Sequence, residues 1–331
     1  MTFLPGLWSA RLPMALTRQL RGLVDQSWYP PEEPRLVTLV PVTLKDRLGQ
    51  APLPSFRRPP VVEVVIGVQL AGTTGFSLES MGRFASALAD EGLPVQESKP
   101  AIPVRPEHFD PKALAVGASL DVLLGSGHPP VCHVLRSPSG DEMVQIQQDW
   151  MAVNWRKTSP DSAYPRWPSR WETFNRRALL AERHLGNNSL KYGLVEVTYV
   201  NHIELDGTRT PHSEADRVFA FLNSSGTLTD GFLSKAEQCQ AELTFLFGPA
   251  SNAPSVGRLN VSISPGWSTA DMRQIFVMTL TARGRPDRSS LRDVRGFADL
   301  AREWIVRAFS DLTTPYMHEV WAREDPERST Q

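Results

Sequence analysis

Three strand patterns follow one another near the end of the chain, with no helical pattern between them. They lie at residues 241–247, 258–264 and 275–282, and each concentrates apolar side chains in a short run. Parallel strands need a long crossover connection, usually a helix, whereas short turns join antiparallel strands. This run of strands therefore predicts an antiparallel sheet and an α+β fold, not a doubly wound parallel sheet.

The clearest single strand pattern begins after the double proline at residues 59–60. Alternate side chains are apolar over this stretch, as expected for a strand with one buried face. Those residues are Val62, Val64, Ile66, Val68 and Leu70. Val61 and Val65 lie on the other face and predict that it is partly covered too.

Three helices are expected between and after the strands. Ser77 is a good N-cap for the first, with Leu78, Met81, Ala85 and Leu88 on its apolar side. The second begins with a capping box at residues 169–172. Its predicted apolar stripe consists of Trp171, Phe174, Ala178, Ala181 and Leu185. The third covers residues 293–312.

The stretch from residue 143 to 156 changes its apolar phase near Gln148. Val144 and Ile146 occupy even positions, whereas Met151, Val153 and Trp155 occupy odd ones. A slip of one residue exchanges the two faces of a strand, so a bulge or a tight hairpin is expected at residues 148–149.

These elements predict mainly antiparallel sheets with helices packed on one face. Two related halves, each a sheet crossed by a helix, stay an open alternative, because the similarity between them is too weak to establish a repeat. The expected organisation is a proline-rich N-terminal extension (1–57), a first α+β half (58–206), a connecting segment (207–234) and a second half (235–331) that ends in a long helix. The extension could also reflect a start codon assigned too early.

Composition restricts the functional classes. The formal net charge is −1, which argues against a protein that binds polyanions over its whole surface. Cys132 and Cys239 are the only cysteines and have no metal-ligand spacing, so two reduced thiols are expected. No apolar run approaches the ~18 residues of a membrane helix, and the N-terminus is a poor signal peptide. We therefore expect a cytoplasmic protein with no membrane partner.

Sequence motifs for common chemistry are missing. There is no Walker A loop, dinucleotide fingerprint, HExxH or GxSxG pattern, so neither a metal nor a cofactor is expected. Cys132 and His133 could form a nucleophile–base pair only if both turned inward. Adjacent strand residues point to opposite faces, which argues against this pair. The seven histidines are expected to be structural or exposed.

Long polar side chains gather around the hairpin and predict a binding surface. This candidate set consists of Gln145, Gln147, Asp149, Asn154, Arg156 and Tyr164. Amides both donate and accept hydrogen bonds, and a guanidinium can grip a carboxylate or phosphate. On a strand, Asn154 and Arg156 share one face, and Trp155 points into the core. The alternative is a solvated strand face with Arg156 in an ordinary salt bridge.

A second, basic stretch follows and contains tryptophans. Its candidate nucleic-acid contacts are Arg166, Arg170, Arg176 and Arg177, with Trp167 and Trp171 interleaved. Basic and aromatic side chains together can neutralise and stack a nucleic-acid strand. The alternative is a solvated helix face whose tryptophans lie in the core.

Several short stretches in fixed order resemble an uncharacterised, sporadically distributed bacterial protein family. They are PVVEV (60–64), QIQQD (145–149), NWRK (154–157), YP (164–165), VTYVNHI (197–203), FSDLTT (309–314) and Trp321. The resemblance covers roughly residues 58–322. It implies no catalytic residues, and the patchy distribution hints at accessory genes such as phage-defence or toxin–antitoxin modules.

Two functional hypotheses follow. The first is a non-enzymatic interaction protein, such as an adaptor or antitoxin of an accessory bacterial system, with another protein as its partner. Nine tryptophans and the lack of a catalytic constellation favour it. The second is a hydrolase or nuclease that uses Asp149, Asn154, Arg156 and a distant acid such as Glu196 or Glu204.

Overall fold

The computed structural model describes residues 52–71, 76–101, 131–186, 190–205, 212–223, 236–248, 256–269 and 271–324. Residue contacts divide the chain into two units, Met1–Pro41 and Val42–Gln331, and every described residue belongs to the second. Most of the predicted N-terminal extension and much of the predicted connecting segment therefore lie outside the described residues.

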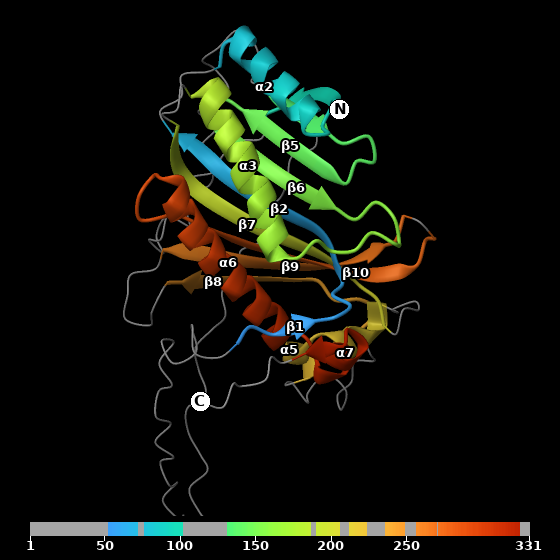
Figure 1. Ribbon diagram of the computed structural model, residues 1–331. Helices are drawn as coiled ribbons and strands as arrows, with labels where there is room; N and C mark the ends of the chain where they lie inside the picture. Colours follow the sequence, from blue (N-terminus) through green and yellow to red (C-terminus); the bar gives the residue numbers. More distant parts are fainter. Residues whose placement is uncertain are drawn as a thin grey trace, which may run out of the picture. The chain divides into compact units, whose positions relative to one another are not determined.

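The core of the second unit is a nine-stranded antiparallel sheet (Figure 1). The strand order across it is β3-β4-β5-β6-β2-β7-β10-β9-β8, and every neighbouring pair is antiparallel. The strands are β2 (Val61–Ala71), β3 (Val95–Pro100), β4 (Val131–Arg136), β5 (Glu142–Gln147), β6 (Trp150–Arg156), β7 (Lys191–Ile203), β8 (Ala241–Phe247), β9 (Gly257–Trp267) and β10 (Gln274–Gly284). The predicted α+β class with antiparallel sheets is confirmed.

Two long helices, α3 (Trp167–Leu185) and α6 (Leu291–Leu312), lie across one face of this sheet (Figure 1). A third helix, α2 (Leu78–Asp90), packs beside α3. Shorter helical elements are η2 (His212–Glu214), α4 (Ala215–Val218), α5 (Ala220–Asn223) and α7 (Pro315–Val320). A separate two-stranded ladder joins β1 (Ser55–Phe56) to β11 (Arg323–Glu324).

The chain order repeats a pattern about the middle of the sheet. In the first part, β2 is followed by α2, by a meander from β3 to β6, and by α3. In the second part, β7 is followed by short helices, by a meander from β8 to β10, and by α6. The last meander strand returns to the first strand in each case, so β6 pairs with β2 and β10 pairs with β7. The two starting strands, β2 and β7, lie side by side.

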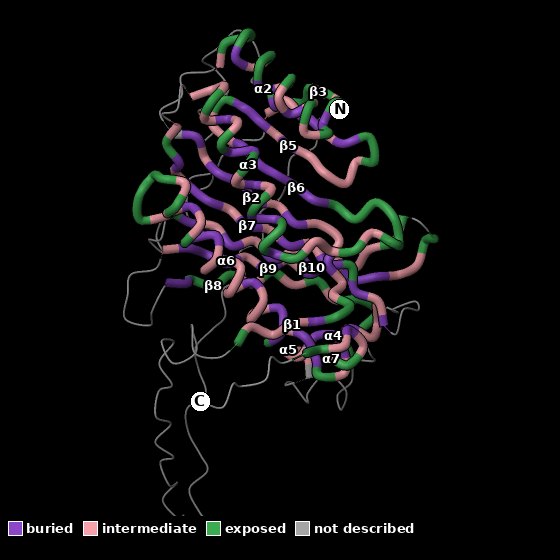
Figure 2. Tube along the Cα trace, viewed as in Figure 1, coloured by how far each residue is buried: buried purple, intermediate pink, exposed green. Residues whose placement is uncertain are grey.

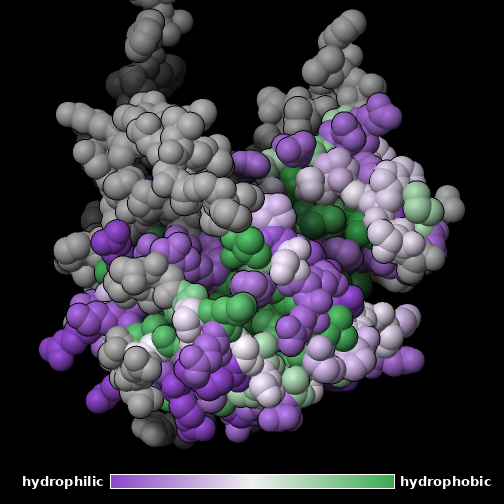
Figure 3. Space-filling view, turned by 90° about the horizontal axis from the view of Figure 1, so that it is seen from above, coloured by the Kyte–Doolittle hydropathy of each residue, from purple (hydrophilic) through white to green (hydrophobic). Residues whose placement is uncertain are grey.

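The hydrophobic core lies between the sheet and its helices. Buried residues follow the strands beneath α3 and α6, whereas exposed residues concentrate in turns and loops (Figure 2). In β2, Val64, Ile66 and Val68 are buried, as the predicted alternation requires. Seen from above the α2 end, apolar side chains occupy a central band of the surface, with hydrophilic ones around it (Figure 3).

Local signals predicted some helix details correctly and others wrongly. Ser77 does cap α2, since its hydroxyl accepts from the Ser80 amide. The predicted stripe was wrong at Leu78, which is 91% exposed, because the buried face of α2 runs through Ser80, Phe84 and Leu88. Leu78 is the first helical residue and points away from that face.

The capping box predicted for the second helix is wrong. Helix α3 begins at Trp167, so Ser169 lies inside its first turn and caps nothing. Pro168 fits this early start, because the first amides of a helix have no intrahelical partner for proline to remove. The stripe itself is confirmed, since Trp171, Phe174 and their predicted partners are buried apart from the half-buried Leu185.

The structure accounts for the change of phase near Gln148 and places Phe56 in the packed body. Residues 148–149 form the tight turn of the β5–β6 hairpin, with Gln147 opposite Trp150. Phe56, placed by sequence in the extension, is buried against Phe309 and Trp321. The packed body therefore includes residues before position 58.

Candidate functional site

The face of the sheet opposite α3 and α6 carries mainly polar side chains. Strand register aligns one row of them across six strands. From β5 to β9 the row consists of Gln145, Ala152, Gly67, Glu196, Arg283 and Arg258. We call this surface the open face, because neither α3 nor α6 covers it; Gln147, Ala152, Asn154 and Arg258 on this face are nevertheless buried.

Trp150 occupies the centre of the open face because Gly67 has no side chain. A Cβ atom on Gly67 would lie 2.3 Å from Cζ2 of the Trp150 ring, so no other residue type fits there without displacing the ring. Cζ of Arg283 lies 5.9 Å from the centroid of the same ring. This distance is within the range of a cation–π contact.

One nitrogen of the Arg283 guanidinium makes no hydrogen bond to the described residues. Its Nε atom lies 3.6 Å from Oε2 of Glu196, an ion pair that is too long for a hydrogen bond. This Nε is buried and has no hydrogen-bond partner within the described part of the chain. The next strand places the buried Arg258 directly opposite the partly exposed Arg283.

Four residues of the predicted binding set lie on the open face. Gln145, Gln147, Asn154 and Arg156 all point to this side, as the alternation predicts, and Trp155 is buried on the other. Arg156 is 56% exposed and is held by Glu63, whose carboxylate accepts from its Nε and Nη2 at 3.0–3.3 Å. Asn154 donates to the same carboxylate at 3.3 Å. This is the ordinary salt bridge that the alternative interpretation expected.

The other two residues of that set lie elsewhere. Asp149 is in the hairpin turn and accepts a 2.9 Å hydrogen bond from Gln147. Tyr164 lies on the helix side, where its ring packs on Trp155 and its hydroxyl is 2.9 Å from that of Tyr199. Burial raises the pKa of both tyrosines, so their hydroxyls stay protonated and act as hydrogen-bonding groups. The structure therefore does not bring Tyr164 to the open face.

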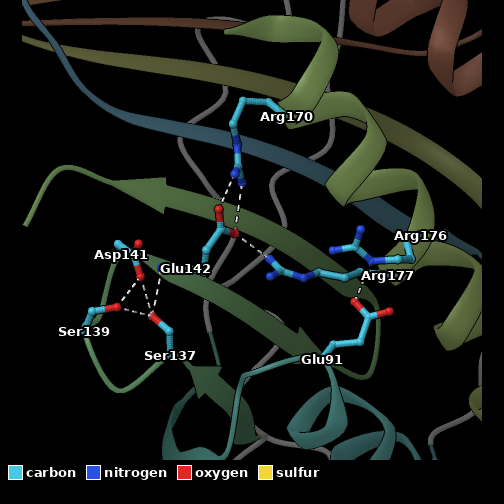
Figure 4. Close-up of polar contacts among 8 residues, drawn as sticks. All are labelled: Glu91, Ser137, Ser139, Asp141, Glu142, Arg170, Arg176 and Arg177. Carbon is cyan, nitrogen blue, oxygen red and sulfur yellow. Dashed lines mark hydrogen bonds and ion pairs between the residues drawn. The ribbon is translucent and has the colours of Figure 1, made fainter. Parts of the chain in front are cut away.

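The predicted nucleic-acid arginines do not form one surface. Arg170 and Arg177 have only 3% of their side chains exposed, and both bind the carboxylate of Glu142 beneath α3 (Figure 4). Arg176 points outward, 53% exposed, and pairs with Glu91 at 2.7 Å. Arg166 precedes α3 and donates to the carbonyl of Phe56 at 3.0 Å. Two of the four guanidinium groups are thus inside the protein, where a nucleic-acid strand could not reach them.

Other candidate chemistry is not assembled in the described residues. Cys132 and His133 point to opposite faces of β4, and burial raises the pKa of the Cys132 thiol. No three His, Cys, Asp or Glu side chains of the described residues come together in a way that could hold a metal ion. None of the described helices is long and apolar enough to cross a bilayer.

Sequence reasoning missed Trp150 and Arg283 as partners. They lie on β6 and β10, far apart in the chain, and only the sheet order brings them together. The one local signal was Gly67 inside a strand pattern, which marks a bulge or the close approach of another group. No protein-family model matches the sequence, and no curated protein matches it at a significant level. The site is therefore interpreted from its geometry.

Proposed function

We propose that this chain is a binding protein whose open face holds a segment of a protein partner. The observation that carries this function is the Trp150 ring over Gly67, with the partly exposed Arg283 guanidinium 5.9 Å from the ring centroid. Tryptophan and arginine are the residue types most enriched among energetically dominant interface positions. Trp150 offers a platform for an apolar or planar group, and Arg283 offers a donor for a carboxylate.

The charges of the open face favour a protein over a nucleic acid. Basic side chains alternate with acidic ones, since Glu63 neutralises Arg156, Glu97 neutralises Arg136, and Glu196 faces Arg283. A nucleic-acid surface needs an excess of basic side chains along one stripe. The many amides and hydroxyls of this face instead match the backbone and polar side chains of a peptide segment. A role in an accessory bacterial system, such as phage defence or a toxin–antitoxin pair, rests on the family resemblance alone.

The enzyme hypothesis receives less support from the geometry. Asp149 directly precedes β6 and Arg156 is its last residue, so the two lie about 23 Å apart at ~3.3 Å per strand residue. The two distant acids are engaged separately, Glu196 with Arg283 and Glu204 with Arg273. These groups do not converge on one reacting atom, which a hydrolase or nuclease site requires.

The function is tested by crosslinking in the native host. A photoreactive residue replaces Gln145 on the open face, and the matched control replaces Leu179, a 46% exposed residue of α3. We expect one discrete protein adduct from position 145 and none from position 179. Mass spectrometry identifies the adduct, and nuclease and protease digestion separate the two classes of partner. A nuclease-sensitive adduct, or equal labelling from both positions, contradicts the proposed function.

Arginine variants then locate the centre of the contact. Arg283→Gln removes the guanidinium whose Nε has no hydrogen-bond partner within the described residues, and we expect it to reduce the adduct at least tenfold per folded molecule, as ~1.4 kcal/mol of binding does. Arg156→Ala removes a guanidinium that Glu63 already holds, and we expect a smaller reduction. The reverse order of effects would move the centre of the contact to the Arg156 end of the face.

A further inference from the structure

The two edge strands of the nine-stranded sheet, β3 and β8, differ in the features that prevent another strand from pairing with them. At one edge, β3 carries Lys99, ends in Pro100, and pairs Glu97 with Arg136 at 2.8 Å. Charge and proline on an edge strand are the usual means by which proteins prevent strand addition. At the other edge, β8 (AELTFLF) has neither lysine nor proline.

The β8 edge is apolar and accessible. Phe245 is 40% exposed and Leu246 is 48% exposed, although both are large hydrophobic residues. Among the described strands, β8 is hydrogen-bonded to β9 alone, on one side. The outer side presents backbone N–H and C=O groups, whose natural partner is another extended strand.

We propose that β8 pairs with β8 of a second copy of this chain, antiparallel and about a two-fold axis at Thr244. The geometry of β8 supports a second copy because the strand is complementary to itself in this register. Leu243 then lies opposite the partner's Phe245, Glu242 lies opposite the partner's Leu246, and Thr244 lies opposite the partner's Thr244. The single charge of β8, Glu242, does not face its own copy, so no like charges oppose one another.

In this dimer the helices of the two copies lie on the same side of the joined sheet. Leu243 and Phe245 share the helix side of β8 with Phe247, as their pairing with Val261, Leu259 and Gly257 shows. A two-fold axis normal to the sheet therefore places apolar side chains against apolar side chains beneath the two α6 helices. On the open face, Thr244 donates to Asn260 at 3.1 Å and is exposed. The two sheets become one continuous sheet.

Thr244 lies opposite the partner's Thr244, so substitutions at this position test the proposed register directly. Light scattering after size exclusion should give twice the 36.8 kDa chain mass for the full chain at tens of micromolar. Thr244→Lys places two lysines face to face and should halve the mass, and Thr244→Glu should do the same. An equal mixture of these two variants should restore the dimer, because each interface then holds one lysine and one glutamate. Ser98→Lys on the exposed β3 edge is the control and should leave the mass unchanged.

Each result decides the matter. A monomeric wild-type chain at these concentrations overturns the dimer, and a dimer that survives Thr244→Lys places the interface elsewhere. Two monomeric variants that fail to recombine overturn the two-fold axis at Thr244. Melting curves check that the variants are folded. If Thr244→Lys does not fold, Leu246→Glu takes its place, because Leu246 is exposed and would lie opposite the partner's Glu242, so that like charges face one another; retention of the dimer in that variant counts against the proposal.

Discussion

The two long helices cover the same face of the sheet, but different chemistry attaches them to it. Beneath α3, Glu142 of β5 binds the buried guanidinium groups of Arg170 and Arg177. Beneath α6, the contact is apolar, with Val294, Ala298, Ala301 and Ile305 buried and Trp304 stacked on Phe247 at 5.4 Å. An ionic contact depends on every partner being present, whereas an apolar contact loses stability in proportion to what is removed.

The ionic attachment contains more positive than negative charge. Two arginines share one carboxylate, and Nε of Arg177 has no hydrogen-bond partner within the described residues. Burial is the main cause that lowers the pKa of Arg177, and Glu142 opposes it. Among the described residues, Glu142 is the carboxylate that pairs with both buried guanidinium groups, and its removal should be the most damaging change at either helix.

Glu142→Ala is expected to produce the largest loss of stability. It leaves two guanidinium groups buried without their carboxylate, and breaking a buried ion pair costs about 3–5 kcal/mol. Chemical denaturation of the wild type and the variant measures the difference. A loss below about 1 kcal/mol would show that water reaches Arg170 and Arg177 and that the two attachments are energetically alike.

A triple variant sharpens this result. Glu142→Leu combined with Arg170→Met and Arg177→Leu replaces the whole cluster by apolar groups of similar length. Such replacements of buried ion clusters are often neutral or stabilising. We expect the triple variant to recover most of the stability that Glu142→Ala loses. If it is less stable than Glu142→Ala, the ion cluster contributes net stability of its own.

Ile305→Val tests the apolar attachment and is expected to have an intermediate effect. Ile305 is 1% exposed on the buried side of α6, and removal of one methylene group there costs about 0.5–1.5 kcal/mol. The same denaturation experiment measures it. A loss as large as that of Glu142→Ala would mean that α6 tolerates no local relaxation, and the contrast between the two helices would then disappear.

Where the sequence predicted a strand, it also predicted the buried face, because alternation is a local property; β3 and β4 were not predicted. The buried side of β2, the turn at residues 148–149, and the shared face of Asn154 and Arg156 all follow from neighbouring residues. The pairing of Trp150 with Arg283 could not be predicted, since it depends on the order of strands that are distant in sequence.

The two attachments also differed in how far sequence could predict them. The stripe of α6 is apolar, so its buried side was evident. The stripe of α3 includes Arg170 and Arg177, which were assigned to a surface because arginine is usually exposed. A positional signal was present, because these residues are seven apart and adjoin the buried Trp171, Phe174 and Ala178. Spacing on a helix was here a better guide to burial than residue type.

Arg176→Ala is expected to have the smallest effect, and its neighbour provides the matched control. Arg176 and Arg177 are consecutive residues of α3 with the same helix propensity, but their side chains are 53% and 3% exposed. Arg176 forms an exposed pair with Glu91, and such pairs contribute about 0.2–1 kcal/mol, less at high salt. Arg177→Ala removes a buried charged hydrogen bond and should cost about 1.5–3 kcal/mol. Denaturation at low and high salt separates the two, since only the Arg176→Ala difference should shrink as salt rises. Equal losses from both variants would mean that Arg177 is as well hydrated as Arg176, and the ionic attachment of α3 would then be a surface contact.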